Sequence, residues 1–147
     1  MLYLCNYFLF MHVYTNNFER IQPVIFHSKK ITVLRGAVFI KENLPEEIDR
    51  VTQLMLKRLK QENKLHIKHV IAMVFSVTND ITAKNPATSA REAGFDVPLF
   101  CVQEAQFENS PKACIRLMLW YAGSIKHPYH VYCEGAEILR PDITSKY

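Results

Sequence analysis

The sequence predicts an α+β domain, in which a mixed five-stranded sheet carries one long and one short helix on one side. Three observations support this fold class. Five apolar runs have the length and composition of strands. One long segment repeats apolar residues at helical spacing. The elements follow the order strand, long helix, strand, short helix and three further strands, with no internal repeat.

A chain of 147 residues, 49% hydrophobic and 22% charged, is typical of one globular domain. We assign this domain to residues 31–147. Residues 1–30 are rich in Leu, Tyr, Phe and Asn, and we interpret them as an appended leader outside the fold that is poorly ordered. They lack the features of a secretory signal, and their apolar stretch is too short to span a membrane. A weak targeting or membrane-contact segment is the alternative.

The first strand is predicted over Ile31–Ile40, which is apolar and rich in β-branched residues. A helix follows, because Asn43 can cap a helix and Pro45 is tolerated in the first turn. Its core-facing residues are those that recur at helical spacing: Ile48, Val51, Met55 and Leu59.

The second strand is predicted over Val70–Val77 and is expected to be buried on both faces. A polar loop leads to a short helix over Pro86–Ala93, closed by Gly94. Three more strands are expected over Val97–Val102, Cys114–Tyr121 and His130–Leu139, and Arg140–Asp142 ends the ordered pattern. Such a sheet leaves edges and part of one face to protect, so we expect an oligomer.

The formal charge of +4 falls further once the leader is removed, and no lysine or arginine cluster occurs. The composition therefore does not indicate a nucleic-acid-binding protein. Four cysteines without paired spacing argue against a disulfide framework and favour a reducing, cytoplasmic setting. The pairs His66/His69 and His127/His130 have no further ligand at suitable spacing, so we predict no metal site.

Arg116 lies within the apolar run Cys114–Trp120. A guanidinium is almost never fully buried without a partner, so this arginine needs an anion. Glu104 is one candidate, and an anionic small molecule is the other. Three more arginines, Arg35, Arg91 and Arg140, fall on or beside predicted elements. Several arginines with few acids nearby favour a bound polyanion, because the guanidinium fork binds carboxylates well.

Other candidate groups accompany these arginines. Cys101 and Glu104 would face opposite ways on a regular strand and share a site only if the strand ends or bulges near Gln103. Tyr132 carries a phenol that needs a partner if it is buried. No glycine-rich phosphate loop and no evident nucleophile–base pair accompanies them. These residues suggest a site of charges and hydrogen bonds around an anion.

Six segments occur in the same order in a known family: Arg35–Ala37, Ser76–Ile81 leading to Pro86–Ala87, Ala90–Arg91, Val97–Leu99 with Cys101 and Gln103–Glu104, Cys114–Arg116, and His130–Tyr132 with Leu139–Asp142. On these segments, residues 31–142 resemble the monofunctional chorismate mutases of the AroH class. The resemblance implies a homotrimeric pseudo-α/β-barrel with active sites between subunits. It implies rearrangement of chorismate to prephenate in the synthesis of Phe and Tyr, with no cofactor.

Residue roles follow from the same resemblance. Arg116 would donate to the ether oxygen, and Glu104 would accept from the ring hydroxyl. Arg35 and Tyr132 would hold the enolpyruvyl carboxylate, and Arg91 would approach from a neighbouring subunit. The remaining substrate contacts would come from Ala87, Thr88, Leu99, Cys101, Leu139 and Arg140.

Two positions depart from the family pattern. Asn85 replaces an apolar or aromatic residue, and Thr88 stands where a lysine can occur. Two other functions remain as alternatives. One is a trimeric imine or enamine deaminase, and the other is a non-catalytic module that binds small dicarboxylates.

Overall fold

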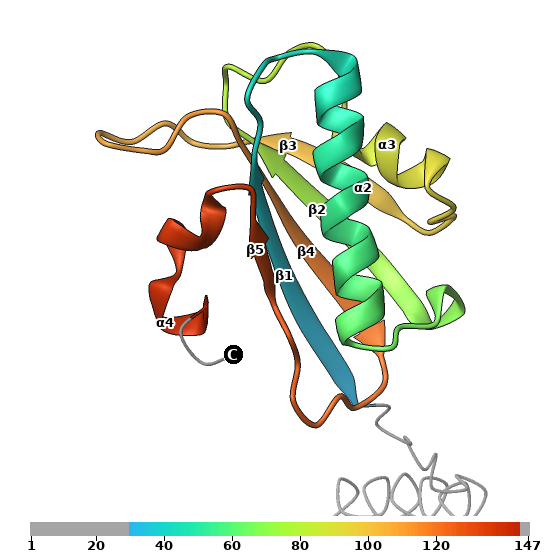
Figure 1. The fold of residues 1–147 in the computed structure, drawn as a ribbon. Coiled ribbons are helices and arrows are strands. Elements are labelled where there is room, and N and C mark those ends of the chain that lie inside the picture. The colour runs from blue at the N-terminus through green and yellow to red at the C-terminus, as the bar shows by residue number, and fades with distance from the viewer. Residues whose placement is uncertain (1–29, 145–147) are drawn as a thin grey trace, which may run out of the picture.

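A computed structural model describes residues 30–144, so residues 1–29 of the predicted leader lie outside the described part of the chain. The strands are β1 (Ile31–Phe39), β2 (Val70–Val77), β3 (Leu99–Gln103), β4 (Cys114–Ala122) and β5 (Val131–Cys133) (Figure 1). The α-helices are α2 (Pro45–Glu62), α3 (Pro86–Glu92) and α4 (Pro141–Thr144). Two 3₁₀ helices, η2 (Ile67–His69) and η3 (Ala136–Leu139), complete the fold.

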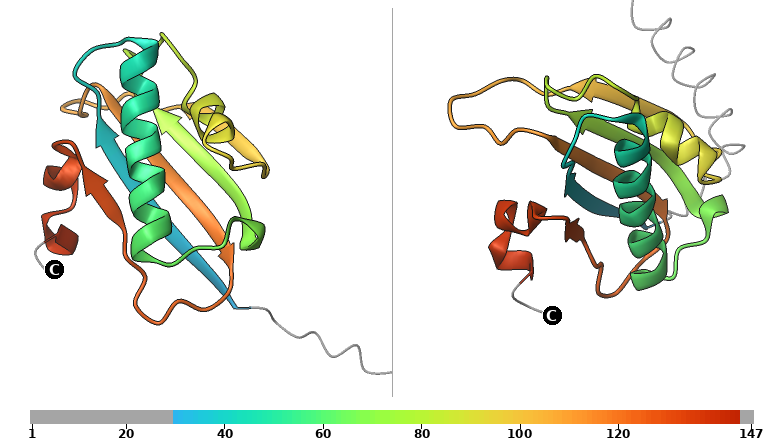
Figure 2. Two further views of the ribbon diagram at one scale, coloured as in Figure 1. Left: turned by 45° about the vertical axis from the view of Figure 1, so that its right-hand side comes forward. Right: turned by 45° about the horizontal axis from the view of Figure 1, so that its top comes forward.

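The five strands form one mixed sheet in the order β3-β2-β4-β1-β5. Strand β4 pairs antiparallel with both β1 and β2. At the edges of the sheet, β3 pairs parallel with β2, and β5 pairs parallel with β1. Helices α2 and α3 lie on the same face of this sheet (Figure 2). The predicted α+β class is therefore confirmed.

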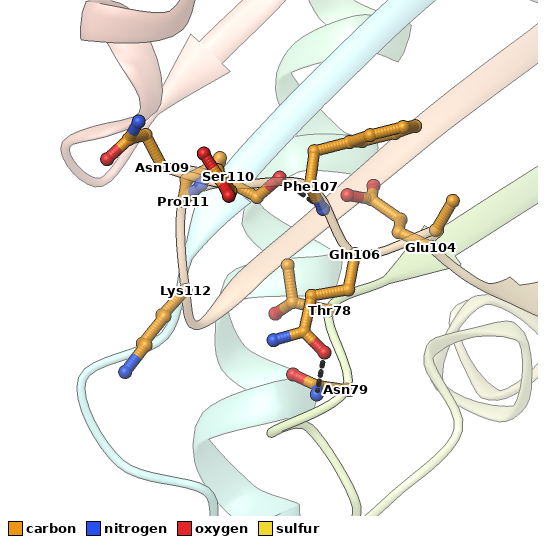
Figure 3. Close-up of a pocket in the computed structure, with 11 residues that line it drawn as sticks. Thr78, Asn79, Glu104, Gln106, Phe107, Asn109, Ser110, Pro111 and Lys112 are labelled. Atoms are coloured by element: carbon orange, nitrogen blue, oxygen red, sulfur yellow. Dashed lines mark hydrogen bonds between the residues drawn. The ribbon is translucent and has the colours of Figure 1, made fainter.

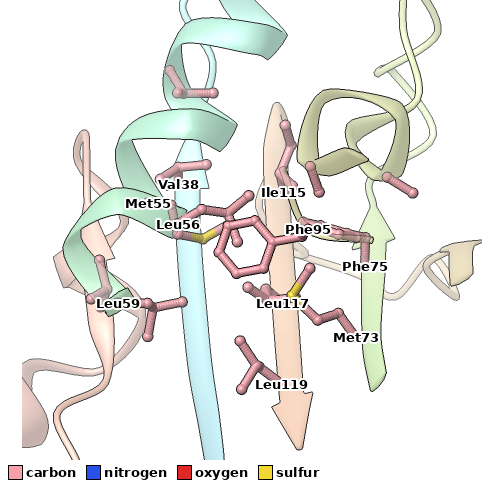
Figure 4. Packing of buried hydrophobic residues seen from close by; sticks show 14 of the residues in the cluster. Val38, Met55, Leu56, Leu59, Met73, Phe75, Phe95, Ile115, Leu117 and Leu119 are labelled. Carbon is pink, nitrogen blue, oxygen red and sulfur yellow. The ribbon is translucent and has the colours of Figure 1, made fainter. Parts of the chain in front are cut away.

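The hydrophobic core lies between α2 and the sheet (Figure 4). The four predicted core residues of α2 are at most 1% exposed: Ile48, Val51, Met55 and Leu59. They pack against fully buried strand residues that include Leu34, Phe75 and Ile115. Burial of each large apolar side chain contributes about 1.5–3 kcal/mol, so this interface holds the helix on the sheet.

Gly36 allows α2 to lie close to β1. A Cβ atom at this position would come within 2.6 Å of the Met55 sulfur and 3.4 Å of a Leu59 methyl carbon. Any side chain there would push the helix away or force both core residues to move. Gly36 thus lets α2 pack directly on β1, while the neighbouring Arg35 and Ala37 point to the opposite face.

The two asparagines near the helix starts act differently from the prediction. The N-cap of α2 is Leu44, which makes no side-chain cap bond, and the Asn43 side chain instead bonds to residues 82 and 83 of the next loop. Asn85, in contrast, caps the N-terminus of α3, because its Oδ1 accepts from the Ala87 N–H at 2.9 Å. This bond gives Asn85 a structural role where an apolar residue was expected.

The other face of the sheet is open. Strand β2 was predicted to be buried on both faces, which is wrong, because Val74 and Ser76 on this face are only half-buried. Neither α2 nor α3 reaches that side (Figure 2). Large apolar side chains are exposed there, namely Phe100 (61%), Met118 (39%) and Val102 (37%).

The predicted strand His130–Leu139 is too long. Strand β5 ends at Cys133, and the chain then forms the 3₁₀ helix Ala136–Leu139. The break has a backbone cause, because Glu134 (φ 56°) and Gly135 (φ 89°) both adopt the left-handed conformation. Residues 140–142 do not end the order either, since Pro141 opens the short helix α4.

Candidate active site

The strand register places polar residues from distant parts of the sequence in two rows on the open face. The first row contains Tyr132, Ala37, Arg116 and Ser76. The second contains Arg35, Met118 and Val74. Residues paired across a sheet point to the same face. The predicted site residues Arg35, Arg116 and Tyr132 therefore lie together.

A cavity of about 480 Å³ covers these rows. Its polar lining comes from Arg35, Ser76, Arg116, Tyr132 and Arg140, and its apolar lining includes Val74, Met118 and Leu139. The volume is in the range of small-molecule sites, which typically combine an apolar wall with a few polar groups. We call this the cationic cavity, because three arginines line it.

Arg116 pairs with Glu104, as the sequence suggested. One terminal nitrogen of the guanidinium, Nη1, donates to Glu104 Oε2. The other carboxylate oxygen, Oε1, accepts from the Ser76 hydroxyl at 2.7 Å. The Glu104 side chain is 15% exposed and that of Arg116 is 37% exposed. Both oxygens of the carboxylate are thus held, while Arg116 remains open to the cavity.

Arg35 is exposed, and it takes part in none of the ion pairs among the described residues. Its backbone N–H donates to His130 Nδ1 at 3.1 Å, just before the first pair of the parallel β1–β5 ladder. Burial lowers the pKa of His130, and the guanidinium groups of Arg35 and Arg140 lower it further. His130 therefore favours its neutral form, whose Nδ1 can accept this bond.

Arg140 enters the cavity from the C-terminal side and has its own partner. Its Nε and Nη2 atoms donate to the two carboxylate oxygens of Asp142 at 2.9 and 2.8 Å. This bidentate pair raises the pKa of Arg140 above its usual range, and Tyr132 adds to the effect. Tyr132 and Arg140 therefore interact at one end of the cavity.

The predicted site residues of β3 lie elsewhere. Cys101 pairs with the fully buried Phe75, and Leu99 pairs with the fully buried Met73, so both face the helices. Glu104 follows the end of β3 and reaches the open face, where it meets Arg116. The expected opposite orientation of Cys101 and Glu104 is what the structure shows. Burial raises the pKa of the Cys101 thiol, which disfavours a thiolate there.

The α3 residues also lie outside the cationic cavity. Ala87 is buried in the core, Thr88 is half-buried and Arg91 is exposed. The start of α3 borders a second, smaller cavity of about 300 Å³, lined by Asn85, Pro86, Cys101 and Gln103 among others. The predicted site residues thus fall into two groups that one chain does not bring together.

A third cavity of about 320 Å³ lies under the loop between β3 and β4. Glu104 borders it together with amide side chains, and Asn79 Nδ2 donates to Gln106 Oε1 at 3.2 Å (Figure 3). Phe107 in this loop is 72% exposed. Glu104 thus borders this loop cavity and contacts Arg116, which lines the cationic cavity.

Sequence reasoning missed Ser76 and His130 as site residues. Ser76 is a hydroxyl in the otherwise apolar run Val70–Val77, which is a usable signal. The role of His130 depends on its position beside the backbone of β1, which the sequence does not reveal.

No helix of the described residues could cross a membrane, being either too short or too polar. Within residues 30–144, no group of three or more His, Cys, Asp or Glu could hold a metal ion. The rings of His66 and His69 lie 6.2 Å apart.

The fold and the cationic cavity define a class of protein, an α+β protein whose open sheet face carries a cavity lined by three arginines. Comparison with known proteins specifies the class further. The family "Chorismate mutase type I" matches residues 31–143. A chorismate mutase from Bacillus subtilis is 34% identical over 115 residues, which cover 76% of this chain and 91% of that protein.

Two further relatives agree. A chorismate mutase from Thermus thermophilus is 35% identical over 116 residues, covering 76% of this chain and 95% of that protein. The structure of a chorismate mutase from Clostridium thermocellum has a TM-score of 0.68 and 33% identity, and the likeness covers 73% of this chain and 98% of that one. The chain belongs to the chorismate mutase type I family and is an isomerase. The chorismate mutase family and function expected from the sequence are confirmed, and the two alternative functions are not favoured.

Proposed function

We propose that the cationic cavity binds chorismate and rearranges it to prephenate in one pericyclic step, without a covalent intermediate. The observation that carries this proposal is the convergence of Arg35, Arg116, Arg140 and Tyr132 on one cavity in a chain of this family. Chorismate is a dicarboxylate, and arginine binds carboxylates bidentately.

Arg116 is the proposed source of transition-state stabilisation. Negative charge grows on the ether oxygen as the C–O bond breaks, and a guanidinium donor already in place stabilises that charge. Glu104 would accept from the ring hydroxyl of the substrate. Its contact with Arg116 keeps the two groups together before the substrate binds.

Arg35 and Tyr132 would bind the enolpyruvyl carboxylate, with Arg140 and Leu139 at the C-terminal side. Arg35 is suited to this role, because no ion pair with another described residue engages it. The apolar wall formed by Val74 and Met118 would pack against the substrate and favour its compact, reactive conformer.

We further propose that the complete site forms between the subunits of a homotrimer. Two features support this assembly. The open sheet face exposes Phe100, Val102 and Met118, which a partner could bury. The predicted contacts Ala87, Thr88, Leu99, Cys101 and Arg91 lie apart from the cationic cavity of their own chain. A neighbouring subunit could supply them, as expected for a cyclic, heterologous interface.

A reducing, cytoplasmic setting fits the thiols. Cys101, Cys114 and Cys133 are all free. Burial raises the pKa of each, in the case of Cys114 to about 12. These thiols are suited to packing rather than to disulfide chemistry.

An assay of chorismate loss and prephenate formation tests the mechanism. We expect Arg116→Ala to lower kcat by at least about a hundredfold, because one preorganised donor to developing charge is lost. KM should change much less, since that charge is nearly absent in bound chorismate. Arg35→Ala should instead act mainly on KM, because the carboxylate it binds is present throughout.

Normal turnover in Arg116→Ala would contradict the assigned roles. Tight binding of chorismate without turnover by the unmodified protein would identify a non-catalytic module. Release of ammonia from an imino acid, without chorismate turnover, would identify a deaminase.

A further inference from the structure

Ser76 places a hydroxyl in the apolar strand β2, on the face of the sheet that carries the cationic cavity. It pairs with Arg116 of β4 on one side and with Val102 of β3 on the other. Ser76 is half-buried and contributes to the cavity lining. A small apolar residue would fill the same space, so packing alone does not require a hydroxyl here.

The hydroxyl is used for one bond. Ser76 Oγ donates to Glu104 Oε1 at 2.7 Å, while Arg116 Nη1 donates to Oε2 of the same carboxylate. The terminal torsion of glutamate is broad, so a carboxylate with one donor can still rotate about its last bond. A second donor on the other oxygen fixes the plane of the group.

The fixed carboxylate also fixes the guanidinium. Arg116 lies on a long flexible stem and presents its donors in a rigid planar fork. Because one nitrogen of that fork, Nη1, donates to Glu104, the orientation of the carboxylate sets the direction of the donors that remain. Those donors face the cavity, where the proposed reaction develops negative charge.

We propose that Ser76 is a positioning residue of the active site, which orients Glu104 and through it aims Arg116 at the ether oxygen of the substrate. This inference rests on the roles proposed above for Arg116 and Glu104. The hydroxyl itself need not touch the substrate. Its contribution is to make the Arg116 donors preorganised rather than mobile, which is the condition for effective electrostatic catalysis.

The direct test compares Ser76→Ala, Ser76→Cys and Ser76→Thr in the intact protein. We expect Ser76→Ala to lower kcat roughly tenfold, as for the loss of a hydrogen bond to a charged group, with KM changed less than about twofold. Ser76→Cys is almost isosteric but a weak donor, so it should fall near Ser76→Ala. Ser76→Thr keeps the hydroxyl and should recover most of the activity.

Two controls separate positioning from general damage. Thr32→Val removes another strand hydroxyl, which donates to the Gly123 carbonyl at 2.7 Å outside the cavity, and should leave kcat unchanged. In a Glu104→Ala background, Ser76→Ala should have almost no further effect on kcat, because the residue through which it acts is gone.

The outcomes are distinguishable. Equal kcat in Ser76→Ala, Ser76→Cys and the unmodified protein would overturn the inference while leaving the proposed function intact. A full additional loss from Ser76→Ala in the Glu104→Ala background would also overturn it. If Arg116→Ala is as active as the unmodified protein, the proposed mechanism itself is contradicted, independently of the result for the Ser76 variants.

Discussion

Arg35 and Arg116 lie on the same sheet face but have different neighbours. Arg116 contacts Glu104, and that carboxylate is held on its other oxygen by Ser76. Arg35 is anchored through its backbone by His130, and its guanidinium is exposed. The first arrangement suits a donor that must already be aimed when charge develops. The second suits a side chain that closes on a carboxylate when the ligand arrives.

We expect His130 to make the stability of the fold depend on pH. Burial and the guanidinium groups of Arg35 and Arg140 lower its pKa in the folded state, so the unfolded chain binds a proton more readily. Stability contributed by neutral His130 is complete above the ordinary histidine pKa and is lost as pH falls from there toward the folded value. We expect the midpoint of urea unfolding to decrease as the pH is lowered from about 7.5 to about 5.5.

His130→Asn tests this assignment, because an amide oxygen can accept the Arg35 N–H without titrating. The decrease over this pH range should be smaller in His130→Asn than in the unmodified protein. His66→Asn, at an exposed histidine, is the matched control. An equal decrease in all three proteins would show that other groups cause it.

At the level of elements, the start of α3 depends on one side chain. Asn85 Oδ1 accepts from Ala87 N, and Pro86 occupies the first helical position. The helix has seven residues, too few to be stable by itself, so its cap and its packing decide whether it forms. Asn85, although it departs from the family pattern, therefore stabilises the helix that carries Ala87, Thr88 and Arg91.

Asn85→Ala should destabilise the fold by about 1 kcal/mol, because the cap bond is lost. Asn85→Asp should retain most of the stability, since aspartate also caps helices. Urea unfolding measures both variants. Asn79→Ala, which removes an exposed amide bond to Gln106 in a loop, provides the comparison. If Asn79→Ala lowers the free energy of unfolding as much as Asn85→Ala does, the loss in Asn85→Ala is not due to the cap bond.

At the level of the whole molecule, two groups of predicted contacts lie on different surfaces of one chain. The cationic cavity contains Arg116, whereas Arg91 is exposed on α3 outside that cavity. The open apolar face of the sheet gives a physical reason for association. A ring of copies could join the cavity of one subunit to the α3 region of the next.

Mixing two inactive variants tests this arrangement. Arg116→Ala and Arg91→Ala should each have little activity alone. After unfolding and joint refolding, about a quarter of the sites in a randomly assembled ring would combine two intact halves, so activity should approach a quarter of normal. Mixing Arg116→Ala with Glu104→Ala is the control, because these two residues contact each other within one chain. No recovery in the first mixture would place Arg91 outside the shared site.

Much of the fold could be predicted from local patterns. Helix α2 was predictable because its buried residues recur at helical spacing, and β2 and β4 because apolar runs define them. The end of β5 was not, since it depends on the left-handed backbone at Glu134 and Gly135. The cap of α2 was also missed, because Asn43 bonds to a loop almost forty residues away in the sequence.

The sequence alone determined the family, the need of Arg116 for an anionic partner, and the opposite orientation of Cys101 and Glu104. The family follows from six matching segments in the same order, whereas the other two points follow from residue types and from the two-residue period of a strand. Only the tertiary structure decided which residues share the cationic cavity. Strand register sets Ser76 beside Arg116, and the side chain of His130 meets the backbone of β1. Such contacts join segments far apart in the chain, so no local pattern encodes them.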